Sequence, residues 1–227
     1  MTTHSSRRIN ALANGLGSQN YLEVGVAAGD TFRAVTIPTK WAVDPRFRFD
    51  YAPLETEKVR FFNVPSDDFF ISGQAATPFD IIFLDGLHTF EQTFRDFCSS
   101  LLMTHERSII ILDDTIPSDI YSSLPDINLA IQSRQRAGLK GRAWHGDVFK
   151  MIFAVHDFFP MLSYATVATG GNPQTIVWRE RRSSFKPLFN SLEAISRLSF
   201  FDLHKYQEFI NKENEEELIE KIVGRLK

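Results

Sequence analysis

Three aspartates follow two short apolar runs of the chain, at the points where those runs end. Asp85 follows residues 80–84, and the pair Asp113 and Asp114 follows residues 108–112. If the two runs are neighbouring parallel strands, their carboxyl ends meet at one edge of a sheet and the three carboxylates share it. Two unit charges about 4 Å apart repel by roughly 4 kcal/mol at an effective dielectric near 20. Such a cluster requires a cation, a bound proton or a wider separation.

A divalent cation is the first of these solutions. Oxygen ligands alone favour Mg²⁺, Mn²⁺ or Ca²⁺ over zinc. The sequence predicts a metal site formed by Asp85, Asp113 and Asp114, where the ion could bind two substrate oxygens and lower the pKa of a bound hydroxyl. Two other interpretations stay open: Asp113 or Asp114 caps the following loop, or Asp85 binds only the amino group of a ligand.

His88 lies three residues after Asp85 and adds a proton acceptor to this edge. A neutral imidazole there could take the proton of a hydroxyl while that hydroxyl reacts. We therefore name His88 and Asp85 as the candidate catalytic residues. The alternative is a histidine that only caps or supports its neighbours, because it stands just before a helix-like stretch.

A Gly-rich turn follows the first apolar run. Glu23, Gly25 and Gly29 give the spacing E-x-G-x-x-x-G, and the glycines allow a tight turn and the close approach of a ligand. The dinucleotide fingerprint G-x-G-x-x-G is absent, because Ala27 stands at its second glycine position. Glu23 would repel a phosphate but suits a cationic group. S-adenosylmethionine (SAM), which carries an ammonium and a sulfonium, is the favoured ligand.

Polar residues after the second and third apolar runs extend this binding site. Asp44 ends the second run and is placed to take ribose hydroxyls, a role shared by SAM and dinucleotide sites. Ser66 and Asp67 follow the third run and suit an adenine edge. With Thr31, just after the first turn, the predicted cofactor-binding residues are Glu23, Gly25, Gly29, Thr31, Asp44, Ser66, Asp67 and Asp85.

These residues need a framework that brings successive strand ends together. Helix-like stretches alternate with strand-like runs at residues 21–26, 41–43, 59–64, 80–84 and 108–112. Several runs are apolar at successive positions, as in strands buried on both faces. Between the last two runs, helical spacing is given by Phe90, Phe94, Phe97 and Leu101. The pattern predicts an α/β fold with a Rossmann-like, mostly parallel sheet flanked by helices.

The later part of the chain predicts an antiparallel end to this sheet. Strand-like residues 162–169 and 174–180 are separated by the sequence GGNP, which is typical of a hairpin. Asp147 is expected to cap a helix running from Val148 toward Pro160. From residue 191 the pattern is helical. We therefore predict one domain at residues 1–190 and a C-terminal helical extension at 191–227, which packs on the body or on a second copy.

From Glu23 to Asp114 these motifs resemble those of the class I SAM-dependent methyltransferases. The nearest subgroup ends its fourth strand in D-G-x-H and its fifth in D-D or E-D, as residues 85–88 and 113–114 do. It includes metal-dependent sugar O-methyltransferases of macrolide tailoring and is more distantly similar to catechol O-methyltransferase. The resemblance implies that Asp85, Asp113 and Asp114 hold Mg²⁺ and that His88 is the general base. It covers about the first half of the chain.

The methyl acceptor is expected to bind among later residues, where no motif assigns roles. Candidates are Trp144, which could cover an acceptor ring, with His145 and Asp147 opposite the metal. The expected reaction is O-methylation of a hydroxyl on a small molecule such as a sugar, a glycan precursor or a natural product. Alternatives are a metal-independent SAM methyltransferase of another acceptor, a metal-dependent hydrolase and a non-catalytic SAM-binding subunit.

The composition of the chain limits the kinds of partner that it is expected to bind. The formal net charge of −3 gives no bulk attraction to nucleic acid or to an anionic membrane. No apolar run approaches the length of a membrane span, and the first residues are too polar for a signal peptide, so a cytoplasmic location is expected. The single cysteine, Cys98, excludes an internal disulfide. Association of copies through the C-terminal helices is the one protein partnership expected.

Overall fold

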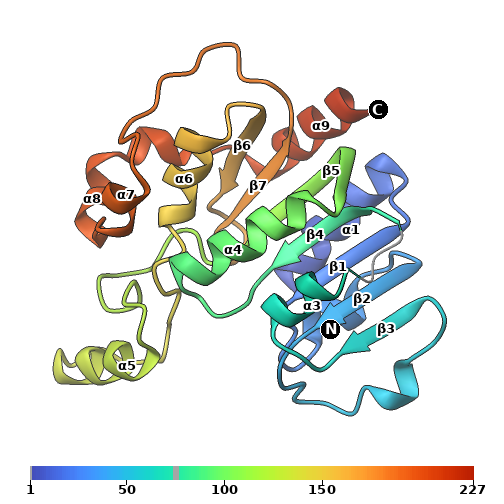
Figure 1. Ribbon diagram of the computed structural model, residues 1–227. Helices are drawn as coiled ribbons and strands as arrows, with labels where there is room; N and C mark the ends of the chain where they lie inside the picture. Colours follow the sequence, from blue (N-terminus) through green and yellow to red (C-terminus); the bar gives the residue numbers. More distant parts are fainter. Residues whose placement is uncertain (1, 74–76) are drawn as a thin grey trace.

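The computed structural model describes residues 2–73 and 77–227 (Figure 1). These residues form a seven-stranded sheet in the order β3-β2-β1-β4-β5-β7-β6. Neighbours from β3 to β5 pair in parallel, whereas β7 runs antiparallel to β5 and β6. The strands are β1 (Asn20–Val24), β2 (Thr39–Val43), β3 (Val59–Phe62), β4 (Phe79–Leu84), β5 (Thr104–Leu112), β6 (Leu162–Val167) and β7 (Gln174–Arg179). The predicted α/β, Rossmann-like sheet with an antiparallel strand is confirmed.

Both faces of the sheet are covered, which explains why its central strands are apolar at successive positions. Side chains of a strand point alternately to opposite faces. In β4, Ile82 and Leu84 belong to the hydrophobic core on one face, and Ile81 and Phe83 to the core on the other; all four are buried. This is the pattern of a parallel sheet between two layers of helices.

Different helices cover the two faces of the sheet. One face is covered by α3 (Ser66–Ser72), α4 (Phe90–Leu101), α6 (Lys150–Phe158) and α7 (Leu192–Ser196), with α8 (Phe200–Lys205) and η2 (Gln207–Ile210) beside them (Figure 1). The other face is covered by α1 (His4–Leu16), α2 (Asp30–Ala34) and α9 (Glu215–Leu226). The turn η1 (Ala52–Leu54) follows β2, and α5 (Ile127–Arg136) lies apart, beyond the end toward which β4 points (Figure 1).

Asp147 does not cap the helix that follows it, contrary to the sequence prediction. That helix, α6, has Phe149 as its N-cap and has no side-chain cap. Asp147 Oδ1 instead accepts the N–H of Phe90, the first residue of α4, at 2.7 Å, and its Oδ2 pairs with Lys150 Nζ at 2.7 Å. Its carboxylate thus stabilises the start of a helix almost sixty residues earlier, which local sequence patterns do not reveal.

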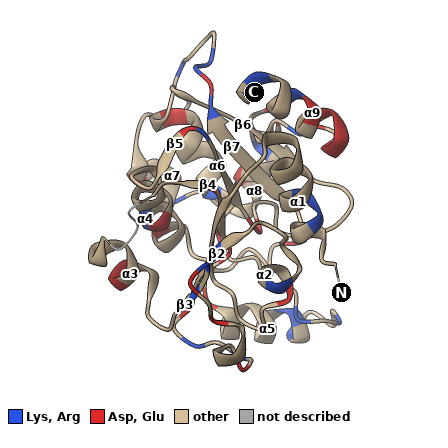
Figure 2. Cartoon of the chain, turned by 90° about the vertical axis from the view of Figure 1, so that its right-hand side faces the viewer, with Lys and Arg blue, Asp and Glu red and all other residues tan. Residues whose placement is uncertain are grey.

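The two ends of the chain pack against each other on the body of the protein. The sequence pattern gives no prediction of α1, which begins with Thr3 and Ser6 bonded reciprocally as a capping box. Ile9 and Leu12 of α1 share a core with Leu218 and Ile222 of α9. Figure 2 shows the acidic first turn of α9 and the basic residues of α1 on the same side of the molecule. The helices after residue 191 therefore contribute to the main cores.

Within the described part of the chain, no helix has both the length and the apolar character that crossing a bilayer demands.

Candidate active site

A cavity of about 840 Å³ lies at the carboxyl ends of the parallel strands. Segments that follow β1 to β5 form its wall, joined by Trp144 and Asn172 from later in the chain. The predicted site residues that line it are Glu23, Gly25, Thr31, Asp44, Ser66, Asp85, His88, Asp113, Asp114 and Trp144. The predicted residues outside its wall are Gly29, Asp67, His145 and Asp147. The Gly-rich turn and the acidic edge thus share one cavity.

Gly25 brings the Gly-rich turn against the end of β4. Its φ is +87°, in the left-handed region that favours glycine, and its N–H donates to the carbonyl of Val43 at 2.9 Å. A Cβ atom at this position would lie 1.9 Å from the carbonyl oxygen of Asp85. Because no side chain fits there, only glycine allows the turn and the acidic edge to be neighbours.

Glu23 is almost fully buried beneath the turn, with 2% of its surface exposed. Tyr21 Oη donates a hydrogen bond of 2.6 Å to Glu23 Oε2. Burial raises the pKa of Glu23 to about 8, against this hydrogen bond, and the negative charge of Asp85 acts in the same direction as burial. At neutral pH most molecules therefore hold this carboxyl protonated, until a positive group binds beside it.

Asp44 supports the turn from the end of β2. Its Oδ2 accepts the N–H groups of Val26 and Ala27, both at 2.8 Å, and its Oδ1 accepts that of Arg46 at 2.7 Å. These bonds hold Ala27 at a φ of +47°, which is unfavourable for a residue with a side chain. The first role of Asp44 is therefore to fix the turn, and its predicted contact with ribose stays a prediction.

Ser66 and Asp67 begin α3 but face different surroundings. Ser66 lines the cavity and accepts a hydrogen bond of 3.1 Å from Gln92 Nε2 of α4. Asp67 is half exposed and pairs with Arg95. Gln92, which sequence reasoning missed, lines the cavity and also donates to the buried Asp96 at 3.0 Å. Its position in the first turns of α4, next to Ser66, could not be read from either segment alone.

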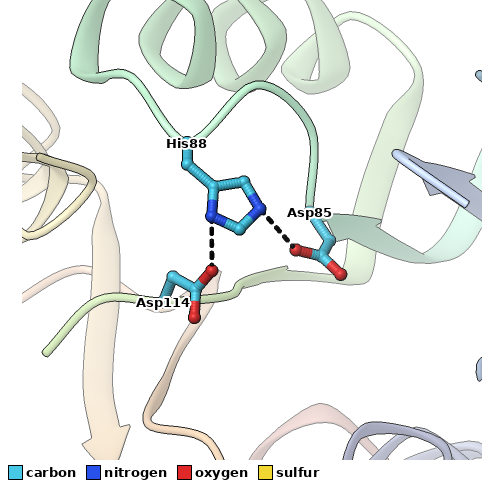
Figure 3. Close-up of side chains that lie close together, drawn as sticks. All are labelled: Asp85, His88 and Asp114. Atoms are coloured by element: carbon cyan, nitrogen blue, oxygen red, sulfur yellow. Dashed lines mark ion pairs between the residues drawn. The ribbon is translucent and has the colours of Figure 1, made fainter. Parts of the chain in front are cut away.

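Asp85, His88 and Asp114 point toward one another at the cavity (Figure 3). His88 Nε2 lies 3.4 Å from Asp85 Oδ1, and His88 Nδ1 lies 2.7 Å from Asp114 Oδ2, an ion pair without good hydrogen-bond direction. One ligand atom from each of the three side chains lies within 4.8 Å of the other two. The sequence grouped Asp113 with Asp85 and Asp114, but here His88 takes that third place.

The three groups set one another's protonation. Burial opposes a charged imidazole, but contacts with Asp114 and Asp85 outweigh it and raise the pKa of His88 to about 10. Burial raises the pKa of Asp85 to about 6, although His88 counteracts it. For Asp114 the effect of burial is outweighed by His88, and its pKa is lowered. The cluster as it stands therefore favours an imidazolium between two carboxyl groups.

Asp113 is held by amide groups that the sequence did not single out. Its Oδ1 accepts from Asn172 Nδ2 at 2.8 Å, from Gln174 Nε2 at 3.2 Å and from the N–H of Asp114 at 2.9 Å. Asn172 Nδ2 also donates to Asp114 Oδ1 at 2.5 Å. Burial raises the pKa of Asp113, and the negative charges of Asp85 and Asp114 add to this effect. Its predicted role as a metal ligand stays a prediction.

Trp144 covers His88. The two rings stack with centroids 4.7 Å apart and planes 6° apart, and Trp144 Nε1 donates to the carbonyl of Leu124 at 2.8 Å. Gly146 makes this approach possible, because a Cβ atom there would lie 1.6 Å from the carbonyl oxygen of His88. His145 Nε2 lies 3.9 Å from Asp114 Oδ1. The segment 144–146 therefore lies against His88 and Asp114, and the predicted contacts of Trp144 and His145 with an acceptor stay predictions.

Comparisons with known proteins give a family match and a set of similar folds. Residues 22–115 match the model of a family described as a methyltransferase domain. An O-methyltransferase from Bacillus cereus in complex with S-adenosylhomocysteine (SAH) gives a TM-score of 0.57 at 16% identity, covering 79% of this chain and 82% of that one. The O-methyltransferase TomG from Streptomyces achromogenes, in complex with SAM, gives 0.54 at 13% identity, covering 77% and 79%. Comparison with curated protein sequences gives no match.

A third structure is the methyltransferase MycE of the mycinamycin biosynthetic pathway, in complex with Mg, SAH and mycinamycin VI. It gives a TM-score of 0.50 at 13% identity and covers 85% of this chain but 52% of the longer one. At such identities these structures establish the fold. The family match runs from β1 to Thr115, just past the acidic edge. Residues 22–115 thus match the model of a methyltransferase domain, and most of the chain shares the fold of these structures.

Proposed function

We propose that the protein is a SAM-dependent O-methyltransferase that acts on a hydroxyl of a small molecule with the help of a divalent cation. The observation that supports this most is the contact between the Gly-rich turn and the acidic edge. Gly25 touches the backbone of Asp85, and both line the cavity that also holds His88 and Asp114. A nucleoside bound at the turn would therefore present its reactive carbon beside a proton acceptor.

The donor site is formed by the segments that follow β1 to β4. Bound SAM supplies an electrophilic methyl group on its sulfonium. Glu23 and Asp85 are acidic groups for its ammonium, and Ser66 and Gln92 present polar groups toward an adenine edge. Asp44 keeps the turn in place through Val26 and Ala27 and stands where ribose hydroxyls would lie. The protein thus binds and orients the donor, which can supply a large part of the rate enhancement.

The residues of the acidic edge fit a divalent cation. Asp85 and Asp114 offer carboxylate oxygens, which Mg²⁺ prefers, and their ligand atoms and those of His88 converge within 4.8 Å. A cation held there would compensate the two negative charges and acidify an acceptor hydroxyl. We propose Asp85 and Asp114 as its ligands, with Asp113 as a further candidate.

His88 is the proposed general base. Its Nε2 faces Asp85 and its Nδ1 faces Asp114, so both carboxyl groups orient the ring in the cavity. Trp144 stacks on the ring and fixes its plane. To accept a proton the imidazole must be neutral, and its pKa of about 10 is a property of the cluster with uncompensated acids. A cation that compensates the negative charges of Asp85 and Asp114 would lower the pKa of His88 toward neutrality.

The acceptor is proposed to be a sugar, a glycan precursor or a natural product with neighbouring hydroxyls. Beside the acids, the cavity wall has apolar side chains of Leu87, Ile127 and Trp144, which could contact the carbon face of a ring. MycE, a fold relative from the mycinamycin biosynthetic pathway, has mycinamycin VI bound in its structure. Asp147 bonds to α4 and Lys150, so we do not include it in the acceptor site.

The cation site predicts that Mn²⁺ binds to the wild-type protein and that Asp114→Asn weakens this binding by at least about tenfold, because a charged ligand is lost. The measurement is the electron paramagnetic resonance signal of free Mn²⁺ during a titration. Asp80→Asn is the matched control, since Asp80 pairs with His105 at the opposite ends of β4 and β5. Equal Mn²⁺ affinity in Asp114→Asn and the wild type would remove the cation from this site.

The buried Glu23 predicts that SAH binding becomes tighter as pH rises. The folded protein holds the Glu23 proton up to about pH 8, and a bound ammonium favours the ionised form, so binding releases a proton. We expect the affinity of SAH to rise between pH 6 and pH 8, by up to about tenfold per pH unit. Titration calorimetry measures it, and Glu23→Gln should flatten the profile. A flat wild-type profile would show that Glu23 does not meet the ammonium.

A further inference from the structure

Arg8 of α1 is a fully buried arginine whose guanidinium is held on three sides. Its Nε donates to Glu215 Oε2 at 2.7 Å. Its Nη1 donates to the carbonyl of Asn172 at 2.6 Å and to Gln174 Oε1 at 2.9 Å, and its Nη2 donates to the carbonyl of Thr169 at 2.7 Å. Burying a charge is costly unless it is paired and hydrogen-bonded. Two of these four bonds go to the turn between β6 and β7 and a third goes to Gln174, the first residue of β7, so Arg8 fixes that turn.

The same turn holds the acidic edge. Asn172 Nδ2 donates to Asp113 Oδ1 and Asp114 Oδ1, and Gln174 Nε2 donates to Asp113 Oδ1. Arg8 bonds the backbone of Asn172, whose side chain carries the contact onward to the acids. One residue of the turn therefore separates the guanidinium of α1 from the aspartates at the end of β5.

Arg8 also decides which way the amide of Gln174 points. A guanidinium is only a donor, so Gln174 must turn its Oε1 toward Arg8. Its Nε2 is then directed to Asp113 Oδ1 and to Ser5 Oγ, the latter at 2.7 Å. Without Arg8 the amide could rotate and place its oxygen against the Asp113 carboxyl. A buried contact between the amide oxygen of Gln174 and a carboxyl oxygen of Asp113 is unfavourable, so the turn and the acids would shift together.

We infer that Arg8 is a positioning residue for the acidic edge, acting through Asn172 and Gln174. The inference rests on the proposed function only in so far as the positioned acids serve a cation and an acceptor; the positioning itself is a property of this chain. It gives the N-terminal helix, which lies outside the family match at residues 22–115, a part in the active site.

Arg7 provides the matched control. It also pairs with Glu215, and it reaches the carbonyl of Gly170 at 3.3 Å, but it has no bond to Asn172 or Gln174 and its side chain is half exposed. Replacing Arg7 therefore weakens the tether between α1 and α9 while leaving the path from Arg8 to the acids. A purely structural role of Arg8 would make the two replacements differ only in stability.

The test compares Arg8→Met, Arg8→Lys, Arg7→Met and Asn172→Ala with the wild type by NMR and by Mn²⁺ titration. In ¹H–¹⁵N spectra, the side-chain NH₂ pair of Asn172, assigned by its absence in Asn172→Ala, should be slow to exchange in the wild type because it binds two buried carboxyl groups. We expect Arg8→Met to lose this protection and to bind Mn²⁺ about tenfold more weakly or worse, as partners that orient ligands typically do when removed. Arg7→Met should keep both properties.

Arg8→Lys should give Asn172 protection and Mn²⁺ affinity between those of Arg8→Met and the wild type. A lysine keeps the charge but cannot bond Thr169, Asn172 and Gln174 at once. If Arg8→Met does not fold, Arg8→Lys supplies both readouts. Unchanged Asn172 protection in a folded Arg8 variant would overturn the inference, as would an equal loss in Arg7→Met. Failure of the proposed function is recognised separately: the wild type would then bind neither Mn²⁺ nor SAH, whereas the NMR comparison would still report on Arg8.

Discussion

Replacing Gly25 with alanine is expected to abolish SAH binding, with a loss of at least about a hundredfold in affinity. Two effects add. The alanine would have to adopt a φ near +87°, which costs about 1–3 kcal/mol, and its Cβ would overlap the carbonyl oxygen of Asp85. The turn must then move away from the end of β4, which removes the donor site from the acidic edge. Titration calorimetry with SAH measures the effect on the folded variant.

Gly141→Ala separates the overlap from the backbone strain. Gly141 has a φ of +86°, almost equal to that of Gly25, but a Cβ there meets nothing within 4 Å. Gly141→Ala should lower the free energy of unfolding slightly and leave SAH affinity unchanged. If Gly25→Ala binds SAH as tightly as Gly141→Ala does, the close approach of the turn to Asp85 is not needed for donor binding.

Replacing His88 with glutamine is expected to lower turnover by about 10²–10⁴-fold, the usual contribution of a general base, with SAH affinity largely retained. Glutamine can keep a polar contact with Asp85 or Asp114 but cannot carry the proton. The measurement is methyl transfer from labelled SAM to any acceptor that the wild type methylates in a panel of sugars and hydroxylated natural products.

His105→Gln is the control for this variant. His105 Nε2 lies 2.8 Å from Asp80 Oδ1, so it forms an Asp–His pair like that of His88, but at the opposite ends of β4 and β5. Its replacement should leave turnover unchanged. Equal turnover in His88→Gln and the wild type would leave His88 a structural role, with the acceptor proton lost directly to water.

The strands of the sheet and its antiparallel end could be predicted because local patterns carry them. Each buried strand is an apolar run, and the GGNP turn marks the antiparallel pair β6 and β7. The ends of the strands were predicted less accurately. β1 stops at Val24, two residues before the apolar run ends, because Gly25 turns the backbone at its positive φ. Parallel pairing brings the carboxyl ends of the strands together, which is why most of the predicted site residues line one cavity.

What could not be predicted depends on contacts between distant segments. The bonds of Arg8 to Asn172 and Gln174 span more than 160 residues, and no local pattern marks a buried arginine. Asp147 fits a local helix cap by sequence, but tertiary packing turns it toward α4. The approach of His88 to Asp85 and Asp114, and the binding of Asp113 by the amides of Asn172 and Gln174, likewise join segments that are distant in the sequence.

A crystal structure with SAH bound tests most directly whether donor and acid chemistry meet in one place. We expect the amino group of SAH near Glu23 and Asp85, its adenine near Ser66 and Gln92, and its sulfur facing the cluster of His88 and Asp114. A nucleoside bound away from the turn at Gly25, or with its sulfur turned from His88, would contradict the proposed O-methyltransferase.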